Sequence, residues 1–256
     1  MKTPPDIYKV LIIPDMHVPS HDVKTLRVVE RFMAEYRWDE YVNLGDLMDF
    51  DMISRFNAET FRKLEGKRIL KEYDEANRIL DRHQSIVRAN NKQAKFTLLQ
   101  GNHDFRMEVL IDKAPQFEGM LEVEKNLRLA ERGVKWVKSW SEGEMHKIGK
   151  LHFAHGMYTT KYHAEKMTAN YGINIAYGHT HDVMSYEKTT RGNINPIMAM
   201  SLGYLADPSK LTYMRNRPNN WSQAIGVAEV RGNGDFNLYP IRIINHRFSY
   251  AGKLYK

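Results

Sequence analysis

The chain has 256 residues, 42% of them hydrophobic and 27% charged, a composition typical of a folded globular protein that argues against disorder, collagen or a coiled coil. It contains no cysteine, so disulfides and thiolate metal sites are excluded, and any bound metal must be held by His, Asp, Glu or Asn. The formal net charge of +7 at pH 7 favours anionic partners such as nucleic acid or a nucleotide, although an ordinary basic cytosolic protein would share it.

The first half of the chain alternates short apolar strands with amphipathic helical segments. In chain order, the patterns predict a strand at 8–13, a helix at 22–36, a strand at 41–44, one or two helices within 57–95, a strand at 96–99 and mixed helical structure at 104–132. The apolar core of the first strand, Val10–Ile13, is far too short for a signal segment or for a membrane span of about 20 residues. We therefore expect a cytoplasmic protein with no membrane contact.

Strands dominate the second half of the chain. They are predicted at 134–137, 145–148, 151–154, 174–177, 183–189, 194–200, 224–230 and 236–244. One helix at 159–170 interrupts them, and Gly232–Asp235 forms a turn between the last two strands. Alternating strands and helices followed by a strand-rich half predict a single α/β domain over 1–256, in which two packed sheets carry helices on the outside.

Five short polar clusters stand directly after five of the predicted strands, at the strand ends where ligands gather in α/β proteins. They are Asp15-Met16-His17, Gly45-Asp46-Leu47-Met48-Asp49, Gly101-Asn102-His103-Asp104, His155-Gly156 and Gly178-His179-Thr180-His181. Each cluster alone has an ordinary explanation as a turn, a cap or a loop. Five of them in one chain, with carboxylate, imidazole and carboxamide groups, are hard to explain by turn chemistry and indicate a shared metal site.

A pair of divalent ions about 3.5–4 Å apart explains these residue types, because it needs one small carboxylate between the ions and further nitrogen or oxygen ligands around each. Asp46 suits the bridging position. Imidazole, carboxylate and amide ligands without thiolate favour Mn, Fe, Zn or Ni over a calcium site built from oxygens alone. We expect two divalent ions, with Mn as the first choice.

The ordered set of clusters resembles the five signature motifs of the calcineurin-like metallophosphoesterase superfamily, and the resemblance extends from Asp15 to His181. It implies a four-layer α-β-β-α sandwich of two mixed sheets flanked by helices. It also implies that one metal is held by Asp15, His17, Asp46 and His181. The other metal would be held by Asp46, Asn102, His155 and His179.

The same resemblance assigns the catalytic groups. It makes His103 the group that protonates the leaving oxygen or steadies the scissile phosphate, with Asp49, three residues beyond the bridge, as its partner. The chemistry is sound without the family, because two ions lower the pKa of a bridging water so that hydroxide attacks phosphorus in line while the ions clamp the other phosphoryl oxygens. His103 then acts as general acid, and Asp49 fixes its orientation.

Two departures from the Ser/Thr protein phosphatases of the superfamily bear on the substrate. Those enzymes carry Arg-Gly after the residue that matches Asp49, where this chain has Phe50-Asp51, and Glu where this chain has Asp104. A missing arginine weakens the case for a phosphomonoester dianion, although Arg55 or Arg106 could replace it. The sequence favours a phosphodiesterase or nuclease. A phosphomonoesterase, including a protein phosphatase, is the alternative, and a non-catalytic phosphate-binding protein is the remote one.

Basic segments support a nucleic acid substrate, DNA or RNA. The helical insertion expected at about 55–95 and the basic C-terminal tail expected at about 245–256 carry an excess of Lys and Arg that could track a phosphate backbone, but a solvated helix face and a loose tail are the alternatives. Between Tyr204 and Trp221, aromatic, amide and basic residues interleave, including Arg215 and Arg217, as in a loop that stacks bases and contacts phosphates. A packed surface loop would have the same composition. The oligomeric state is left open.

Overall fold

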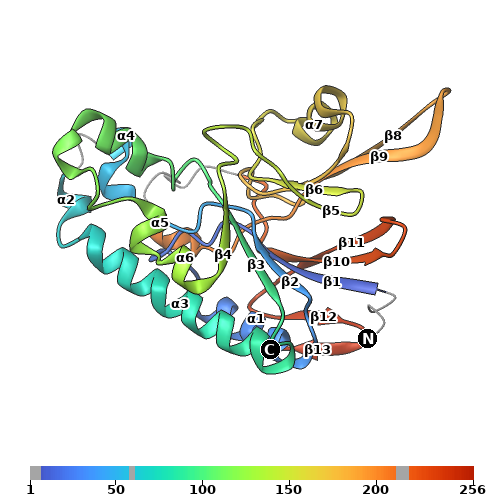
Figure 1. Ribbon diagram of the computed structural model, residues 1–256, viewed down its shortest axis with the longest axis horizontal. Helices are drawn as coiled ribbons and strands as arrows, with labels where there is room; N and C mark the ends of the chain where they lie inside the picture. The colour runs from blue at the N-terminus through green and yellow to red at the C-terminus, as the bar shows by residue number, and fades with distance from the viewer. Residues whose placement is uncertain (1–6, 58–60, 212–218) are drawn as a thin grey trace.

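A six-stranded sheet forms the centre of the molecule in the computed structural model, which describes residues 7–57, 61–211 and 219–256 (Figure 1). Its strands, in spatial order, are β11 (Phe236–Arg242), β10 (Ala224–Arg231), β1 (Ile7–Ile13), β2 (Glu40–Asn43), β3 (Lys95–Leu99) and β4 (Val134–Val137). The strands β1 to β4 pair in parallel, whereas β10 and β11 pair antiparallel. The sheet is therefore mixed, and its parallel half carries the first three motifs.

A second, five-stranded sheet is also mixed. Its order is β5 (His146–Ile148), β6 (Leu151–Ala154), β7 (Asn174–Tyr177), β9 (Asn193–Ser201) and β8 (Ser185–Thr190). The central strands β6, β7 and β9 pair in parallel, and the edge strands β5 and β8 pair antiparallel to them. All strands predicted from the apolar runs are present: the bounds at 134–137, 151–154 and 174–177 are the same as predicted, and the others differ by one or two residues at an end.

The two sheets pack face to face, because alternate apolar side chains of both enter one buried cluster that includes Val10, Val42, Phe153 and Ala176. A larger apolar cluster joins the outer face of the six-stranded sheet to α1 (Val23–Glu35) and α3 (Ile69–Asn90). On the far side, α7 (His163–Tyr171) covers the second sheet through Met167. The layers run helix, sheet, sheet, helix, as expected from the motifs.

Short helices connect these layers. They are η1 (Asp51–Ile53), η2 (Arg55–Asn57), α2 (Phe61–Leu64), α4 (Arg106–Lys113), η3 (Pro115–Phe117), α5 (Val123–Asn126), α6 (Leu129–Arg132) and η4 (Pro208–Lys210). The segment expected as a helical insertion thus carries η2, α2 and α3. The C-terminal segment expected as a tail carries a hairpin, β12 (Phe248–Tyr250) and β13 (Lys253–Tyr255), which the sequence did not predict.

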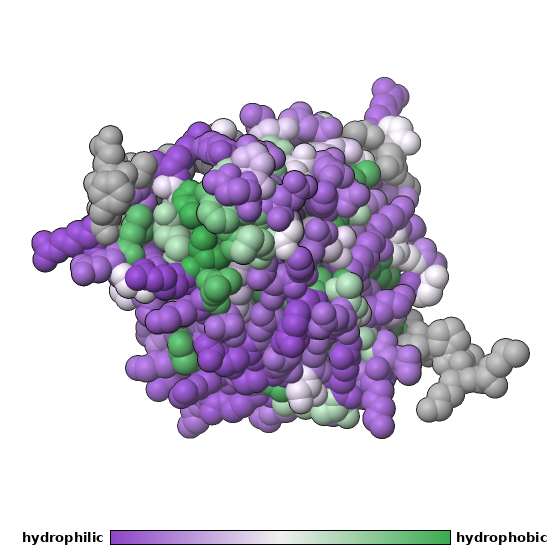
Figure 2. Space-filling view, turned by 60° about the vertical axis from the view of Figure 1, so that its left-hand side comes forward, coloured by the Kyte–Doolittle hydropathy of each residue, from purple (hydrophilic) through white to green (hydrophobic). Residues whose placement is uncertain are grey.

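Figure 2 turns the left-hand side of Figure 1 forward and shows a surface that is mostly hydrophilic, with one apolar patch. Exposed apolar side chains in the helical segments include Leu70, Phe117 and Met120. Within the described ranges, no helix combines the length and the apolar character that crossing a membrane would require.

Candidate active site

The five polar clusters meet at one edge of the sandwich. Asp15, Asp46 and Asn102 follow β1, β2 and β3 of one sheet, while His155 and His179 follow β6 and β7 of the other. Because the carboxyl ends of parallel strands point to the same edge, two parallel sets packed face to face bring their loops together. The structure thus juxtaposes side chains that are up to 166 residues apart in the chain, as the sequence predicted.

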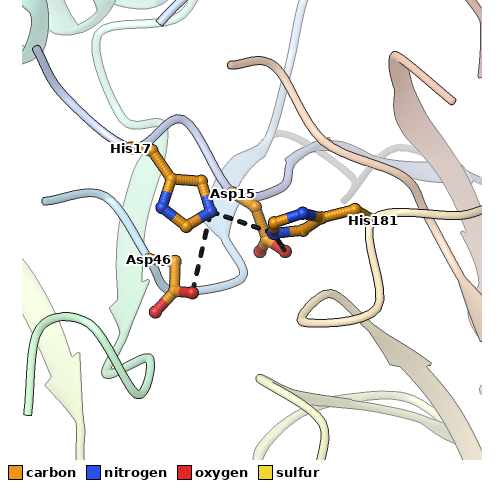
Figure 3. Close-up of side chains that lie close together, drawn as sticks. All are labelled: Asp15, His17, Asp46 and His181. Carbon is orange, nitrogen blue, oxygen red and sulfur yellow. Dashed lines mark hydrogen bonds and ion pairs between the residues drawn. The ribbon is translucent and has the colours of Figure 1, made fainter. Parts of the chain in front are cut away.

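The first group of ligand atoms comprises Asp15, His17, Asp46 and His181, whose oxygen and nitrogen atoms lie within 4.8 Å of one another (Figure 3). The Nε2 atoms of His17 and His181 are 2.9 Å apart. Nε2 of His17 is 3.8 Å from Oδ2 of Asp46, and Nε2 of His181 is 3.4 Å from Oδ2 of Asp15. All four side chains are buried, so this is an inward-facing set of donors with carboxylates on two sides.

The second group comprises Asp46, His155 and His179. Nε2 of His155 lies 3.5 Å from Oδ1 of Asp46 and 3.0 Å from Oδ1 of Asn102, which brings the predicted amide ligand to the same place. Asp46 belongs to both groups, with its Oδ2 toward His17 and its Oδ1 toward His155. That is the arrangement expected of a carboxylate between two cations.

Unsatisfied atoms show that the donor set fits a metal. Oδ1 of Asp15 and Nδ1 of both His17 and His181 are buried without a hydrogen-bond partner, a costly state for a finished protein interior. Burial, with further contributions from neighbouring histidines, lowers the pKa of His179 to about 3 and that of His181 well below its usual value. Neutral imidazole is the form that binds metals.

The carboxylates of the site differ in their electrostatics. Burial, reinforced by the charge of Asp46, raises the pKa of Asp15 well above its usual value. Burial acts in the same direction on Asp46, but the neighbouring His155, His103 and His17 outweigh it and hold the pKa of Asp46 below its usual range. Two carboxylates this close favour a shared cation, since without one their negative charges repel each other.

The backbone of the ligand loops is strained. His17, Asp46, His179 and His181 have φ values of 50°, 47°, 69° and 60°, in the left-handed region that few residues other than glycine adopt. Each such residue costs of order 1–3 kcal/mol, and such strain concentrates at functional sites. The fold therefore holds these four side chains in place at the expense of its own stability.

Two glycines allow the loops to approach the carboxylates. A Cβ on Gly101 would lie 2.1 Å from Oδ1 of Asp46, and a Cβ on Gly178 would lie 2.3 Å from Oδ1 of Asp15. Instead, the backbone N–H of His103 donates to Asp46 Oδ1 at 2.7 Å, and that of His179 donates to Asp15 Oδ2 at 2.6 Å. The Gly of each motif thus makes room for the hydrogen bond that orients a carboxylate.

His103 lies beside both groups and is held by Asp49. Its Nδ1 is 2.9 Å from the carbonyl oxygen of Asp49 and 3.1 Å from Oδ1 of the same residue. Asp49 also accepts a hydrogen bond from Ser20 Oγ at 2.9 Å. Burial opposes the charge of Asp49, but the hydrogen bond with His103 and the nearby imidazole of His17, 3.6 Å away, outweigh it and hold the pKa of this carboxyl below its usual range.

Two of the four arginines predicted to contact substrate lie in the described part of the chain, and one of these, Arg106, reaches this centre. Nη2 of Arg106 lies 2.9 Å from Nε2 of His103, and its Nη1 donates to the carbonyl oxygen of Asp49 at 2.8 Å. Arg55 is exposed on η2. Arg215 and Arg217 lie outside the described residues.

Two neighbours of the site escaped the sequence analysis. Trp140 packs against His179, with ring centroids 5.1 Å apart, and no sequence signal marks it, because it follows β4 rather than a motif. Asp182 accepts hydrogen bonds from Thr180, Ser201 and Asn220 at 2.7–2.9 Å and contacts Nε2 of His163 at 3.0 Å. Its position directly after His181 was the available signal.

A family model for calcineurin-like phosphoesterases matches residues 8–183. The chain therefore belongs to the calcineurin-like phosphoesterase family, as its motifs predicted. Membership supports metal-dependent phosphoester hydrolysis in general, and the buried His and Asp groups at this edge are suited to bind metal.

Two phage proteins and one solved structure illustrate the similarity. The chain is 24% identical to the Gene 54 protein of Mycobacterium phage D29, over 97% of this chain and 98% of the relative. It is 23% identical to the Gene 54 protein of Mycobacterium phage L5 with the same coverage. The crystal structure of Chaetomium thermophilum Vps29 aligns over 96% of both chains with a TM-score of 0.51 and 10% identity, a likeness of fold.

Proposed function

We propose that the protein is a dinuclear-metal phosphodiesterase that hydrolyses nucleic acid or nucleotides. The observation that carries this proposal is the position of Asp46, whose two oxygens face two separate groups of ligands. A single structural cation would need only one such group. A shared carboxylate with a non-ligating imidazole beside it matches the needs of phosphoester hydrolysis.

In this proposal, each ion has its own set of ligands besides Asp46. Asp15, His17 and His181 would hold one, and Asn102, His155 and His179 would hold the other. When bound, the pair of ions lowers the pKa of a water molecule and offsets the charge of the phosphate. Mn is the metal that we would test first, because oxygen and imidazole ligands suit it, and Fe, Zn and Ni are the alternatives.

His103 protonates the leaving oxygen in this mechanism. Asp49 accepts a hydrogen bond from the Nδ1–H group of His103. This leaves Nε2 of His103 directed toward the space that Arg106 also reaches. When substrate binds, Arg106 turns from His103 to a phosphoryl oxygen. Nε2 then takes up a proton from solvent and transfers it to the leaving oxygen. Asp49 is a positioning residue that fixes the ring and stabilises its charged form.

A diester preference follows from the small number of fixed cations. Phe50, which occupies the position where protein phosphatases of the family carry arginine, is fully buried and packs against Tyr73 with ring centroids 5.3 Å apart. It cannot contact a phosphate. Arg106 is then the one arginine that the described part of the chain places against His103. One guanidinium suits the single charge of a phosphodiester better than the double charge of a monoester.

The test is a paired turnover assay of protein stripped of metal and reloaded with Mn, using an aryl phosphodiester and the matching monoester. We expect a higher kcat/KM for the diester, and a loss of about 10²–10⁴-fold in His103→Ala. His152→Ala is the matched control, since His152 is half-buried on β6 outside the ligand groups, and it should retain wild-type turnover.

Three outcomes would contradict the proposal. Preference for the monoester would indicate a phosphomonoesterase. Full activity of His103→Ala toward an unactivated diester would remove the general acid. Binding of Mn without turnover of any phosphoester would favour a non-catalytic phosphate-binding protein.

A further inference from the structure

The outer face of α1 carries a row of exposed cations. Lys24, Arg27 and Arg31 follow one another at spacings of three and four residues, so they share one side of the helix, whereas the opposite side, with Val29 and Phe32, enters the core. At 1.5 Å per residue, the row is about 10 Å long. Figure 1 shows α1 between α3 and the hairpin β12–β13, and α1 packs against both α3 and β13.

The C-terminal segment turns this row into a groove of about 830 Å³. Arg247 and Lys256 line it together with Lys24, Arg27 and Arg31. Glu30 is the one acidic side chain in the lining, and it already forms an ion pair with Arg82 at 3.1 Å. We call this groove, defined by these five cations, the α1 groove.

The cations of the α1 groove are not neutralised by the parts of the chain that the structure describes. None of the five forms an ion pair there, although their neighbours do: Lys253 pairs with Glu35 at 2.5 Å, and Arg82 pairs with Glu30. Five exposed like charges around one groove repel each other, so binding of an anion in the groove lowers the electrostatic free energy of the protein. The groove is too large for a single small anion to meet all five.

Hydrogen bonds connect the near end of the groove to the candidate active site. The backbone N–H of Leu205 donates to the carbonyl of Asp15 at 3.0 Å, and that of Asp22 donates to the carbonyl of Leu205 at 2.9 Å. Asp22 caps α1 by accepting from the N–H of Lys24 at 3.0 Å, and its Oδ2 lies 3.3 Å from Nδ1 of His246, which lines the groove. The groove therefore begins beside the loop that carries Asp15 and His17.

We propose that the α1 groove binds the phosphate backbone of a polynucleotide whose scissile phosphate lies at the metal centre. This inference rests on the proposed function and names its substrate: a nucleic acid strand rather than a mononucleotide or a cyclic nucleotide. A row of about 10 Å is long enough to meet more than one phosphate of a strand, and Arg247 and Lys256 on the other side of the groove can meet further ones.

The binding test uses the purified metalloprotein and a fluorescein-labelled, single-stranded 20-nucleotide DNA with phosphorothioate linkages, whose integrity is checked on a gel afterwards. Anisotropy gives the affinity at 50 and 200 mM salt. Four phosphate contacts, to Lys24, Arg27, Arg31 and Arg247, correspond to a loss of about 50-fold over this range for a single strand. With two contacts removed in Arg27→Ala/Arg31→Ala, the loss falls to about sevenfold, and the affinity at 50 mM salt falls at least about tenfold.

The matched control is Lys147→Ala/Lys188→Ala, which removes two exposed cations from β5 and β8 of the second sheet. We expect wild-type affinity and salt dependence from it. Thermal melting checks that both double variants are folded. Hydrolysis of the aryl phosphodiester, which is too small to reach the groove, should be unchanged in Arg27→Ala/Arg31→Ala, while the KM for a normal oligonucleotide should rise about tenfold or more.

Equal affinity of the wild type and both variants for the labelled DNA would overturn the proposal. So would a competition experiment in which poly-L-glutamate of equal charge displaces the labelled DNA as well as unlabelled DNA does. Because anisotropy requires no turnover, failure of the groove is distinguishable from failure of the catalytic proposal. If the protein binds DNA through α1 but cleaves no phosphoester, the proposal for the α1 groove stands and the proposal of a phosphodiesterase fails. If the protein cleaves the aryl diester but the α1 substitutions do not change DNA affinity, the proposal of a phosphodiesterase stands and the proposal for the α1 groove fails.

Discussion

The two ends of the sheet sandwich both bury acid and imidazole groups, but they use them in opposite ways. At the end away from the motifs, Glu40 accepts hydrogen bonds from Tyr8 at 3.0 Å and Thr97 at 2.8 Å and contacts Nε2 of His146 at 2.6 Å. At the motif end, His17 faces His181 across 2.9 Å, and polar atoms of both are left without partners. A satisfied cluster holds a fold together, whereas an unsatisfied one is arranged for something that binds.

The backbone conformation also differs between the two ends of the sandwich. Glu40, Thr97 and His146 lie within the regular strands β2, β3 and β5, where ladder hydrogen bonds fix them. The ligands of the motif end lie in loops, four of them in left-handed conformations. Substitutions at the two ends should therefore have separable effects, on activity at one end and on stability at the other.

The largest effect is expected from Asp46→Asn. Loss of the shared carboxylate weakens both ligand groups at once, and kcat/KM for a phosphodiester should fall at least about 10³-fold, since the bound ions supply several kcal/mol. The exposed Asp112 provides the control Asp112→Asn, and activity of Asp46→Asn near that of this control would contradict the assignment.

At the other end, His146→Ala should act on stability alone. It leaves Glu40 buried and deprives it of one partner, which costs about 1–3 kcal/mol when a buried acceptor loses its donor. Urea unfolding measures this loss, and the kcat of the protein that remains folded should be unchanged. Substantial loss of kcat at full stability would show that the two ends are not separable.

A smaller effect is expected from Asp182→Asn. Asp182 fixes the loop of His181 by contacts to Thr180, Ser201 and His163, so it is a positioning residue. The apparent affinity for Mn should fall about 10–100-fold, as for other residues that orient metal ligands, and excess Mn should restore turnover. A fall in kcat that no concentration of Mn restores would show a different role.

The buried carboxyl of Glu72 makes the unfolding free energy depend on pH. Its Oε1 is buried without a partner, and burial, with the charge of Asp49, raises the pKa of this carboxyl to about 8, although the N–H of Phe50 donates to its Oε2. Between the usual value and about 8, the folded state holds a proton that the unfolded state has lost, so the unfolding free energy falls as pH rises through this window.

Glu72→Gln keeps the shape and removes the titration. Its stability relative to wild type should rise by about 1 kcal/mol per pH unit, or about 2 kcal/mol between pH 5 and pH 7, in urea unfolding with EDTA present. A difference between wild type and variant that does not change with pH would refute the raised pKa.

Much of the fold and of the site could be predicted because both depend on local signals. Strands such as Val134–Val137 and Leu151–Ala154 are short, mostly apolar segments bounded by turns, and their predicted bounds agree with the structure. The motif residues follow those strands directly, so their convergence could be inferred from the carboxyl ends of a parallel sheet.

Other features depend on contacts between distant segments and left no local signal. The hairpin at 248–255 consists of two strands of three residues, stabilised by packing of Phe248 and Tyr255 against Phe32 rather than by a repeating pattern. The role of Trp140 depends on the fold of the second sheet. The cations of α1 form a groove only together with Arg247 and Lys256, which lie more than 200 residues further along the chain.

The left-handed residues have a consequence for engineering. Glycine would relax the backbone at His17, Asp46, His179 and His181, so at these four positions the backbone favours a residue that lacks the side chain. Each such substitution would remove a proposed ligand. At these positions the backbone and the proposed ligand set therefore favour different residues, and selection for backbone stability alone would act against the residues that the reaction needs.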